Sequence, residues 1–293
     1  MLAIGCIVAL FLPALSDFLR PALPMLVSLV LALGMARIDL ESTVRSALRP
    51  RRMLFLVGVS LAFMPMTAIC YNLIGHLLPE PYRFVLVYLA ATPPIASSAG
   101  FCLLLGFNAR LAVEVTVSAT LLTPLLGPLT VAFFLPETAA LEPMALALSL
   151  GRMILGGVVL AVLIRRFVGP ERISAQALVF DGVGALVMLV FVIPLFAGVS
   201  GLLVADPLHG LVMLAFATIM NLGVNFAVRG AFLRFAAAED AGAAGVLMGN
   251  RTIAIYLAAL PFEPNFALFV ALYQFPMYFT PLAMQHLRRV PGM

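Results

Sequence analysis

Charged residues are scarce in this sequence, and lysine is missing altogether. They make up 10% of the 293 residues, whereas 63% are hydrophobic, and soluble domains carry about 25% charged residues. Because so few polar side chains cannot cover a water-soluble fold of this size, the lipid bilayer must solvate much of its apolar surface. The chain also lacks a polar tail, a low-complexity stretch or a shift in composition. We therefore expect a single transmembrane domain over residues 1–293.

Motifs for metal binding and catalysis are missing as well. Cys6, Cys70 and Cys102 stand alone in apolar segments, without a CxxC or a His/Cys cluster, so neither a zinc site nor a disulfide framework is predicted. The sequence holds no HExxH, GxSxG or paired-carboxylate motif, and we expect no enzyme and no cofactor. All 17 basic residues are arginines, and most of them are scattered in short loops. This distribution is typical of topology determinants, and it does not indicate a nucleic-acid partner.

Long apolar segments are what the sequence has in abundance. A helix rises about 1.5 Å per residue and the hydrocarbon layer is about 30 Å thick, so roughly 20 apolar residues make one crossing. The alternation that a β-barrel needs is not present. The first segment has no basic n-region, so we expect it to be retained. The ten predicted crossings run approximately over 2–19, 22–38, 53–77, 84–106, 109–134, 143–164, 173–199, 206–228, 240–261 and 264–287.

The arginines alternate between the connections in the way that a membrane topology requires. Cytoplasmic loops hold an excess of Lys and Arg. Arg20 and Arg83 fall in the opposite set of loops, together with six carboxylates. We therefore predict both termini in the cytoplasm of a bacterium, with the protein in its inner membrane. The arginine-rich set comprises Arg37, Arg45, Arg49, Arg51, Arg52, Arg110, Arg165, Arg166, Arg172, Arg229, Arg234, Arg288 and Arg289.

Five crossings in each half would orient the two halves oppositely, as in many secondary transporters. The first repeat would cover about 1–135 and the second about 143–290. The string TPL occurs at Thr123 to Leu125 and again at Thr280 to Leu282, at the same place in each half. Chance is the alternative explanation for this match, because the chain is rich in proline and leucine.

Two crossings at matching positions carry signals of an interrupted helix. Pro93 and Pro94 lie in the middle of segment 84–106, where they remove backbone donors and clash with the preceding turn. Segment 240–261 holds the polar string GNRT, residues 249–252, at the same depth. Unwound backbone inside a membrane is tolerated only where it is buried in protein or lines a watery cavity. Paired breaks indicate a transport site, although kinks and small residues also serve helix packing.

Arg251 is the most unusual residue of this string. It lies about eleven residues into its crossing, where insertion scales put the cost of a charge at about 2.5–3.5 kcal/mol. Its planar fork of donors is suited to holding a carboxylate in bidentate fashion. The alternative is a structural ion pair.

Glu114 and two threonines lie in the next crossing. Glu114 is four residues from Arg110, so both occupy one helix face; we expect a local surface pair, or else a proton-coupling carboxylate or partner for Arg251. The hydroxyls of Thr116 and Thr120 line one face and can ligate a hard cation, unless they bond back to their own helix. Asn221 and Asn225 share a face and are expected to bond between helices.

Three segments resemble the bile acid:sodium symporter family. Segment 27–50 is similar to its second span and basic linker, segment 91–125, which begins ATPPIASSAG, to its fourth and fifth spans, and segment 245–261, GVLMGNRTIAIYLAALP, to its ninth. The resemblance covers nearly the whole chain. It implies an all-α membrane protein with ten helices in two inverted five-helix repeats. A core domain with crossing broken helices four and nine would move against a panel domain and import an organic anion with sodium.

We compared this sequence with the family pattern position by position. Three residues depart from the pattern. Ser97 and Ser98 fall on its Ser-Asn pair in helix four, Thr116 and Thr120 on hydroxyl ligands in helix five, and Thr252 on the asparagine of helix nine. Leu247 stands where many members have a sodium-ligating glutamate, Arg251 where they have a glutamine, and Ser60 where helix three offers a glutamine. Hard cations usually need a carboxylate among their oxygens. We therefore hypothesise that the Arg251 guanidinium replaces at least one sodium ion.

The sequence thus predicts a carrier of small organic anions, bile-acid-like or simple carboxylates, that works by alternating access. An arsenite or auxin-type efflux carrier of related architecture is one alternative, with Cys102 about two turns from the break; a non-transporting sensor is another. The predicted substrate-binding residues are Pro93, Pro94, Ser97, Ser98, Asn250, Arg251 and Thr252. The candidates for coupling to Na⁺ or H⁺ are Ser97, Ser98, Glu114, Thr116, Thr120 and Thr252.

Overall fold

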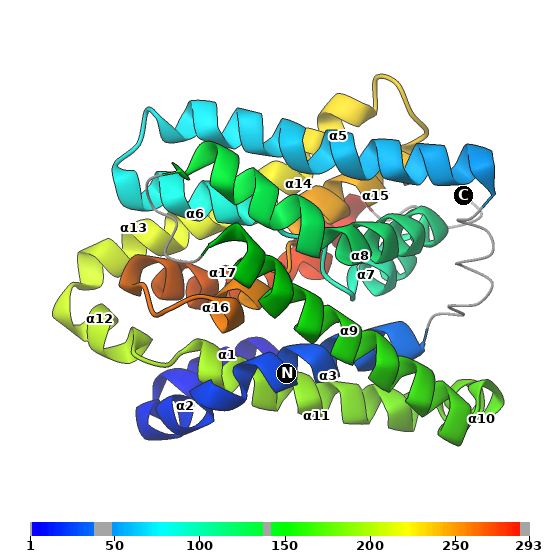
Figure 1. Cartoon of the computed structure of the whole chain (residues 1–293), viewed down its shortest axis with the longest axis horizontal. Coiled ribbons are helices and arrows are strands. Elements are labelled where there is room, and N and C mark those ends of the chain that lie inside the picture. Colours follow the sequence, from blue (N-terminus) through cyan, green and yellow to red (C-terminus); the bar gives the residue numbers. More distant parts are fainter. Residues whose placement is uncertain (1, 38–48, 137–141, 288–293) are drawn as a thin grey trace.

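The computed structural model describes residues 2–37, 49–136 and 142–287, and in these residues the chain folds into helices without strands (Figure 1). Seven of the described helices are long and apolar enough to cross a membrane, so the chain is a multi-pass helical membrane protein. The predicted segments 2–19, 84–106 and 240–261 are divided into shorter helices and are not among the seven. Most of the basic segment 37–52 lies outside the described residues. The seven spans are 13–36, 50–75, 109–134, 143–168, 177–195, 207–232 and 264–284.

The amino-terminal region differs from the prediction. Helix α1 covers Leu2–Leu10 and α2 covers Pro13–Leu19, and the chain then stays helical through η1 (Arg20–Ala22) and α3 (Leu23–Ala36). The predicted boundary after residue 19 is therefore in the wrong place, and the break falls at residues 11–12. The reason is that one proline stands at the first or second position of each of α2, η1 and α3, where the N–H that proline lacks is not needed for a helical hydrogen bond.

Most remaining helices lie where the apolar segments predicted them. Helix α8 has both predicted bounds, because Gly106 turns the chain with a φ of 72° and the Asn108 side chain caps the new helix by accepting from the Leu111 N–H at 3.0 Å. The helices are α5 (Pro50–Gly75), α8 (Ala109–Phe134), α9 (Pro143–Val168), α10 (Pro170–Ala175), α11 (Ala177–Leu195), α12 (Val199–Ala205), α13 (Pro207–Thr218), the π-helix η3 (Ile219–Gly223), α14 (Val224–Phe232), α17 (Pro264–Met284) and η4 (Gln285–Leu287).

Both predicted interruptions are present. Helix α6 (Glu80–Ala90) ends before the proline pair, and α7 (Ser98–Leu105) resumes after it. Helix α15 (Ala238–Gly249) ends at the glycine of the GNRT string, and α16 (Ala254–Ala259) follows after four residues. The local sequence therefore breaks these two helices where it removes donors or lowers helix propensity.

The helices gather in two groups, and α9 runs between them and packs against members of both, α3 in one and α8 in the other (Figure 1). In the lower part of the view, α3 packs against α9 and α11, and α1 and α2 pack against α11. In the upper part, α5 packs against α6 and α8, and α15 against α7, α8 and α14. Helix α17 contacts members of both groups, including α1 and α6. The residues of α3 and α11 form one wall of a large cavity, and the residues of α7 and α8 form the facing wall.

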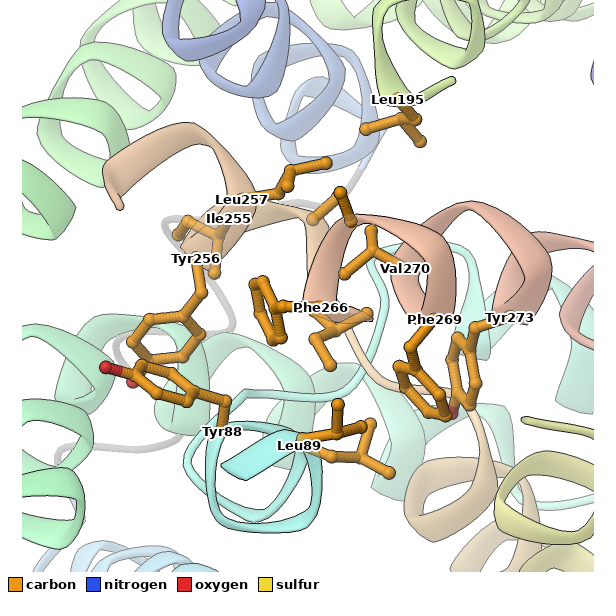
Figure 2. Close-up of a cluster of buried hydrophobic side chains, with 14 of the residues drawn as sticks. Tyr88, Leu89, Leu195, Ile255, Tyr256, Leu257, Phe266, Phe269, Val270 and Tyr273 are labelled. Carbon is orange, nitrogen blue, oxygen red and sulfur yellow. The ribbon is translucent and has the colours of Figure 1, made fainter. Parts of the chain in front are cut away.

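An apolar cluster fills the space between α6, α16 and α17 (Figure 2). Tyr88 packs edge-on against Tyr256 with ring centroids 5.1 Å apart, and Tyr88 also contacts Phe266 at 5.4 Å. Phe269 and Tyr273 continue the aromatic contacts along α17. The Phe266 N–H donates to the Glu263 carboxylate, which belongs to the arginine-poor set of loops, so this cluster lies in the half of the protein opposite the arginine-rich ends.

Candidate functional site

The two breaks lie against each other and satisfy each other's backbone. The Ile95 N–H donates to the carbonyl of Asn250 at 3.0 Å, and the Thr252 N–H donates to the carbonyl of Pro93 at 2.9 Å. These bonds form an antiparallel bridge between chain segments more than 150 residues apart. Buried backbone groups without partners are costly in a membrane. Each interruption therefore depends on the other, and they form one structural unit, which we call the crossing, residues 91–97 and 250–253.

Arg251 lies at the centre of the crossing, opposite Pro94 in the bridge. The residue is 2% exposed. Its guanidinium Nη2 donates to the carbonyl of Ala90 at 2.8 Å, and its backbone N–H donates to the Tyr273 hydroxyl at 3.3 Å. Ala90 is the last residue of α6, where carbonyls lack helical partners and the helix dipole favours a cation. The guanidinium thus stabilises the carboxyl end of the broken helix.

A buried network of side-chain hydrogen bonds holds the second break in place. Asn221 Nδ2 bonds to the Gly249 carbonyl at 2.5 Å and to Asn250 Oδ1 at 3.2 Å, while Thr280 Oγ1 bonds to Asn250 Oδ1 at 2.9 Å. Asn225 Oδ1 accepts from Asn250 Nδ2 at 3.4 Å. The three asparagines and the threonine are fully buried. The predicted interhelical bonding of Asn221 and Asn225 is confirmed, and Thr280 of the second TPL string belongs to the same network.

The serines of the first break differ in their surroundings. Ser97 stands just before α7 and is half-buried, whereas Ser98 is fully buried and its Oγ has no hydrogen-bond partner among the described residues. Thr252 donates its hydroxyl to the Pro94 carbonyl at 3.0 Å. Of the predicted substrate ligands, Pro93, Pro94, Ser98 and Asn250 line neither of the two cavities described next, whereas Ser97, Arg251 and Thr252 do.

A cavity of roughly 1040 Å³ separates the α3–α11 wall from the α7–α8 wall. Its outer end carries Arg37 and Arg110, which belong to the arginine-rich ends, and the Arg110 side chain is 77% exposed. The cavity therefore opens on the side predicted to be cytoplasmic. Drug-sized ligands occupy pockets of about 300–1,000 Å³, so the space suits a large ligand. Most of its lining is apolar, with Val30, Leu33, Leu103, Leu104, Val113, Ala185 and Met188 among the residues.

A smaller pocket of roughly 60 Å³ adjoins the large cavity and is lined by residues of the crossing. The two share Val30, Ala96, Ser97 and Met188 in their walls. Its polar lining residues are Ser97, Arg251, Thr252, Gln274 and Tyr278. Because a water molecule needs about 10–15 Å³ by this measure, the pocket has room for a group of carboxylate size.

Two polar residues of this pocket, Gln274 and Tyr278, were not predicted from the sequence. They lie four residues apart on α17, and Gln274 is 2% exposed, while the Tyr278 hydroxyl is buried without a hydrogen-bond partner in the described part of the chain. An amide near the middle of a largely apolar membrane span was the available signal for Gln274. Tyr278 gave none, because tyrosine is common in membrane proteins as a packing residue.

Glu114 is buried between two arginines. Arg110 Nε donates to its Oε1 at 3.2 Å, as the spacing predicted, and Arg52 donates to Oε2 through Nε at 2.9 Å and also through Nη2. The carboxylate side chain is only 4% exposed, so the expected local pair is present but Glu114 does not lie at the surface. Arg52 on α5, 62 residues earlier, is the partner that spacing along one helix could not reveal.

The hydroxyls proposed as cation ligands are buried in α8. Thr116 is 5% exposed and Thr120 is 2% exposed, and Thr116 Oγ1 has no hydrogen-bond partner within the described ranges. Thr123 and Thr130 instead donate to carbonyls four residues back. Back-bonding therefore does not explain Thr116. Ser60 of α5 is likewise buried with a hydroxyl that no described residue partners, so α5, α7 and α8 each contribute one such oxygen.

Leu247 occupies the position at which the resemblance implies a carboxylate. It is 3% exposed and packs in an apolar cluster with Leu56, Cys102, Leu105 and Val115. Within the described ranges, no group of three or more His, Cys, Asp or Glu side chains comes together. Leu247 therefore supplies no anionic ligand at the position where the resemblance implies one for a hard cation.

No protein-family model matches the chain, and no curated protein matches it. The resemblance to bile acid:sodium symporters accordingly rests on the residues named above, and membership of that family is a proposal.

Proposed function

We propose that the protein is a secondary transporter for organic anions, with the bile acid:sodium symporter architecture of ten membrane-spanning helices in two inverted repeats. The observation that carries this proposal is the crossing of two broken helices at the inner end of a large cavity open to one side. Paired half-helices at mid-membrane are the recurrent form of transporter binding sites. In this proposal both termini are cytoplasmic, and the cavity opens toward the cytoplasm.

The two walls of the cavity give the proposal a mechanism. The group of α1, α2, α3 and α11 would act as the panel, and the group that holds the crossing as the core. In this mechanism the aromatic cluster around Tyr88 and Phe266 would occlude the opposite side. Movement of the core against the panel would close the present cavity and part the occluded side, so that the crossing is exposed alternately to each side of the membrane.

Within the site, Arg251 would hold the anionic group through the donors of its fork, with Ser97 and Thr252 bonding beside it. The first turn of α7, which begins at Ser98, adds positive potential. Asn250 lines neither cavity and is held by Asn221 and Thr280, so we assign it a positioning role.

Sodium coupling is the first testable consequence. Because Leu247 lies in an apolar cluster and Arg251 supplies a fixed cation at the crossing, we expect cholate uptake to proceed at a similar rate with and without a sodium gradient. The measurement is uptake of radiolabelled cholate by proteoliposomes, with protein-free liposomes as the control. A rate that falls more than about tenfold without sodium contradicts the replacement of sodium by Arg251, whereas no uptake under either condition contradicts the carrier itself.

The arsenite-type alternative gains nothing from the structure. Cys102 is fully buried in α7 and packs against Leu105 and Leu247. It lines neither of the cavities at the crossing. A metalloid carrier would need that thiol in contact with its substrate, so we expect Cys102→Ala to leave transport unchanged; loss of transport in this variant would favour the alternative.

A further inference from the structure

The rim of the large cavity carries charged side chains on both of its walls. On one wall, Arg37 at the end of α3 pairs with Asp181 of α11, and both side chains are nearly half exposed. On the other, Arg110 of α8 pairs with Glu114. All four residues line the cavity, so a ligand that enters or leaves on this side passes between them.

The charged residues that line the rim in the described part of the chain are Arg37, Arg110, Asp181 and Glu114, whose formal charges cancel. Arg52 does not line the cavity but also pairs with Glu114, so the two ion-paired groups together hold three arginines and two carboxylates, an excess of one positive charge. Arg52 binds the Glu114 carboxylate through two nitrogens and largely neutralises it.

Arg110 carries the excess charge in an accessible form. Its hydrogen bond within the described residues comes from Nε alone, at 3.2 Å, and its side chain is 77% exposed. The two outer nitrogens of its fork are therefore available to an anion, in the geometry that binds carboxylate or sulfonate through two parallel bonds.

We infer that this rim is a second anion subsite, with Arg110 as its principal ligand, and that it selects amphipathic organic anions. The inference rests on the proposed transport function and extends it. An apolar body would lie along Leu103, Leu104 and Met188 while its carboxylate or sulfonate pairs with Arg110. Electrostatic attraction at a cavity mouth also raises the rate at which anions of the correct charge enter. Neutral molecules of the same shape would gain the apolar contacts only.

The test compares cholate with its neutral methyl ester on protein in lipid nanodiscs. We expect Arg110→Gln to raise the Kd for cholate about tenfold, the effect of losing one charge-assisted contact, and to leave the Kd for the ester unchanged. Asp181→Asn should act in the opposite direction and lower the Kd for cholate, because it frees Arg37. Arg172→Gln is the matched control, since Arg172 is an exposed arginine of α10 on the same side that lines neither cavity.

The outcomes separate this inference from the proposed function. If wild-type protein takes up and binds cholate but Arg110→Gln behaves like Arg172→Gln, the rim subsite is wrong and the carrier stands. Equal losses for cholate and for its ester would show that Arg110 is only structural and would also overturn the subsite. If the wild type neither binds nor transports cholate, the proposed function and the rim subsite both fail.

Discussion

Arg251→Gln should reduce organic-anion transport at least tenfold and also lower the thermal stability of the protein. The guanidinium donates to the Ala90 carbonyl at the end of α6 and lines the pocket at the crossing, so its removal affects both the fold and the proposed ligand. A hydrogen bond from a charged group contributes about 1.5–3 kcal/mol. The measurements are cholate uptake by proteoliposomes and thermal unfolding of purified protein with and without cholate.

The two readouts distinguish the two roles of Arg251. Arg251→Lys keeps the charge without the planar fork, so it should recover part of the stability and little of the affinity for a carboxylate. Arg152→Gln removes an arginine of α9 whose hydrogen bond in the described residues is to its own helix, and it should match the wild type in both assays. If Arg251→Gln loses stability but keeps the full cholate-induced shift in melting temperature, the residue is a helix cap and the anion site lies elsewhere.

Gly249→Ala should cost about 3 kcal/mol of stability and abolish transport. A β-carbon at this position would lie 2.5 Å from the Asn221 carbonyl oxygen and equally close to Asn225 Cγ. These atoms belong to the network that fixes the second break, so the clash cannot be relieved by a flexible side chain. Overpacking of a well-packed core costs typically about 1–3 kcal/mol, and here buried hydrogen bonds are broken as well. Thermal unfolding and cholate uptake measure the effect.

Gly182→Ala is the control for this substitution. Gly182 lies in α11, and a β-carbon there would have no atom of the described residues within 4 Å. Because alanine favours a helix by up to about 1 kcal/mol over glycine, this variant should be as stable as the wild type or slightly more so. A fully active Gly249→Ala protein would show that the asparagine network does not hold the crossing in the functional protein.

The sequence predicted the features that follow from local chemistry. Pro93 and Pro94 cannot continue a helix, and the polar string at 249–252 is costly in lipid unless the chain opens, so the residues themselves determine where both breaks fall. The pairing of Arg110 with Glu114 followed from a spacing of four residues. The burial of Glu114 did not, because it depends on Arg52 from another helix.

The features that were missed depend on packing between distant segments. Nothing in the sequence shows that Arg251 reaches the end of α6, since Ala90 is 161 residues away and contributes only a backbone carbonyl. The pairing of Arg37 with Asp181 joins two helices whose contact is not encoded by any motif. The misplaced boundary after residue 19 has a local cause, because a proline in the first turn of a helix is tolerated and does not mark a break.

Labelling of a cysteine at position 97 tests the central proposal, that the crossing is the transport site, most directly. Ser97 lines both cavities, whereas Cys6 and Cys102 are buried, so Cys70→Ala gives a background suited to a membrane-impermeant thiol reagent. We expect Ser97→Cys in this background to react from the cytoplasmic side, to be protected by cholate, and to become reactive from the opposite side when the carrier turns over. Reaction from one side only, unaffected by cholate, would contradict alternating access at the crossing.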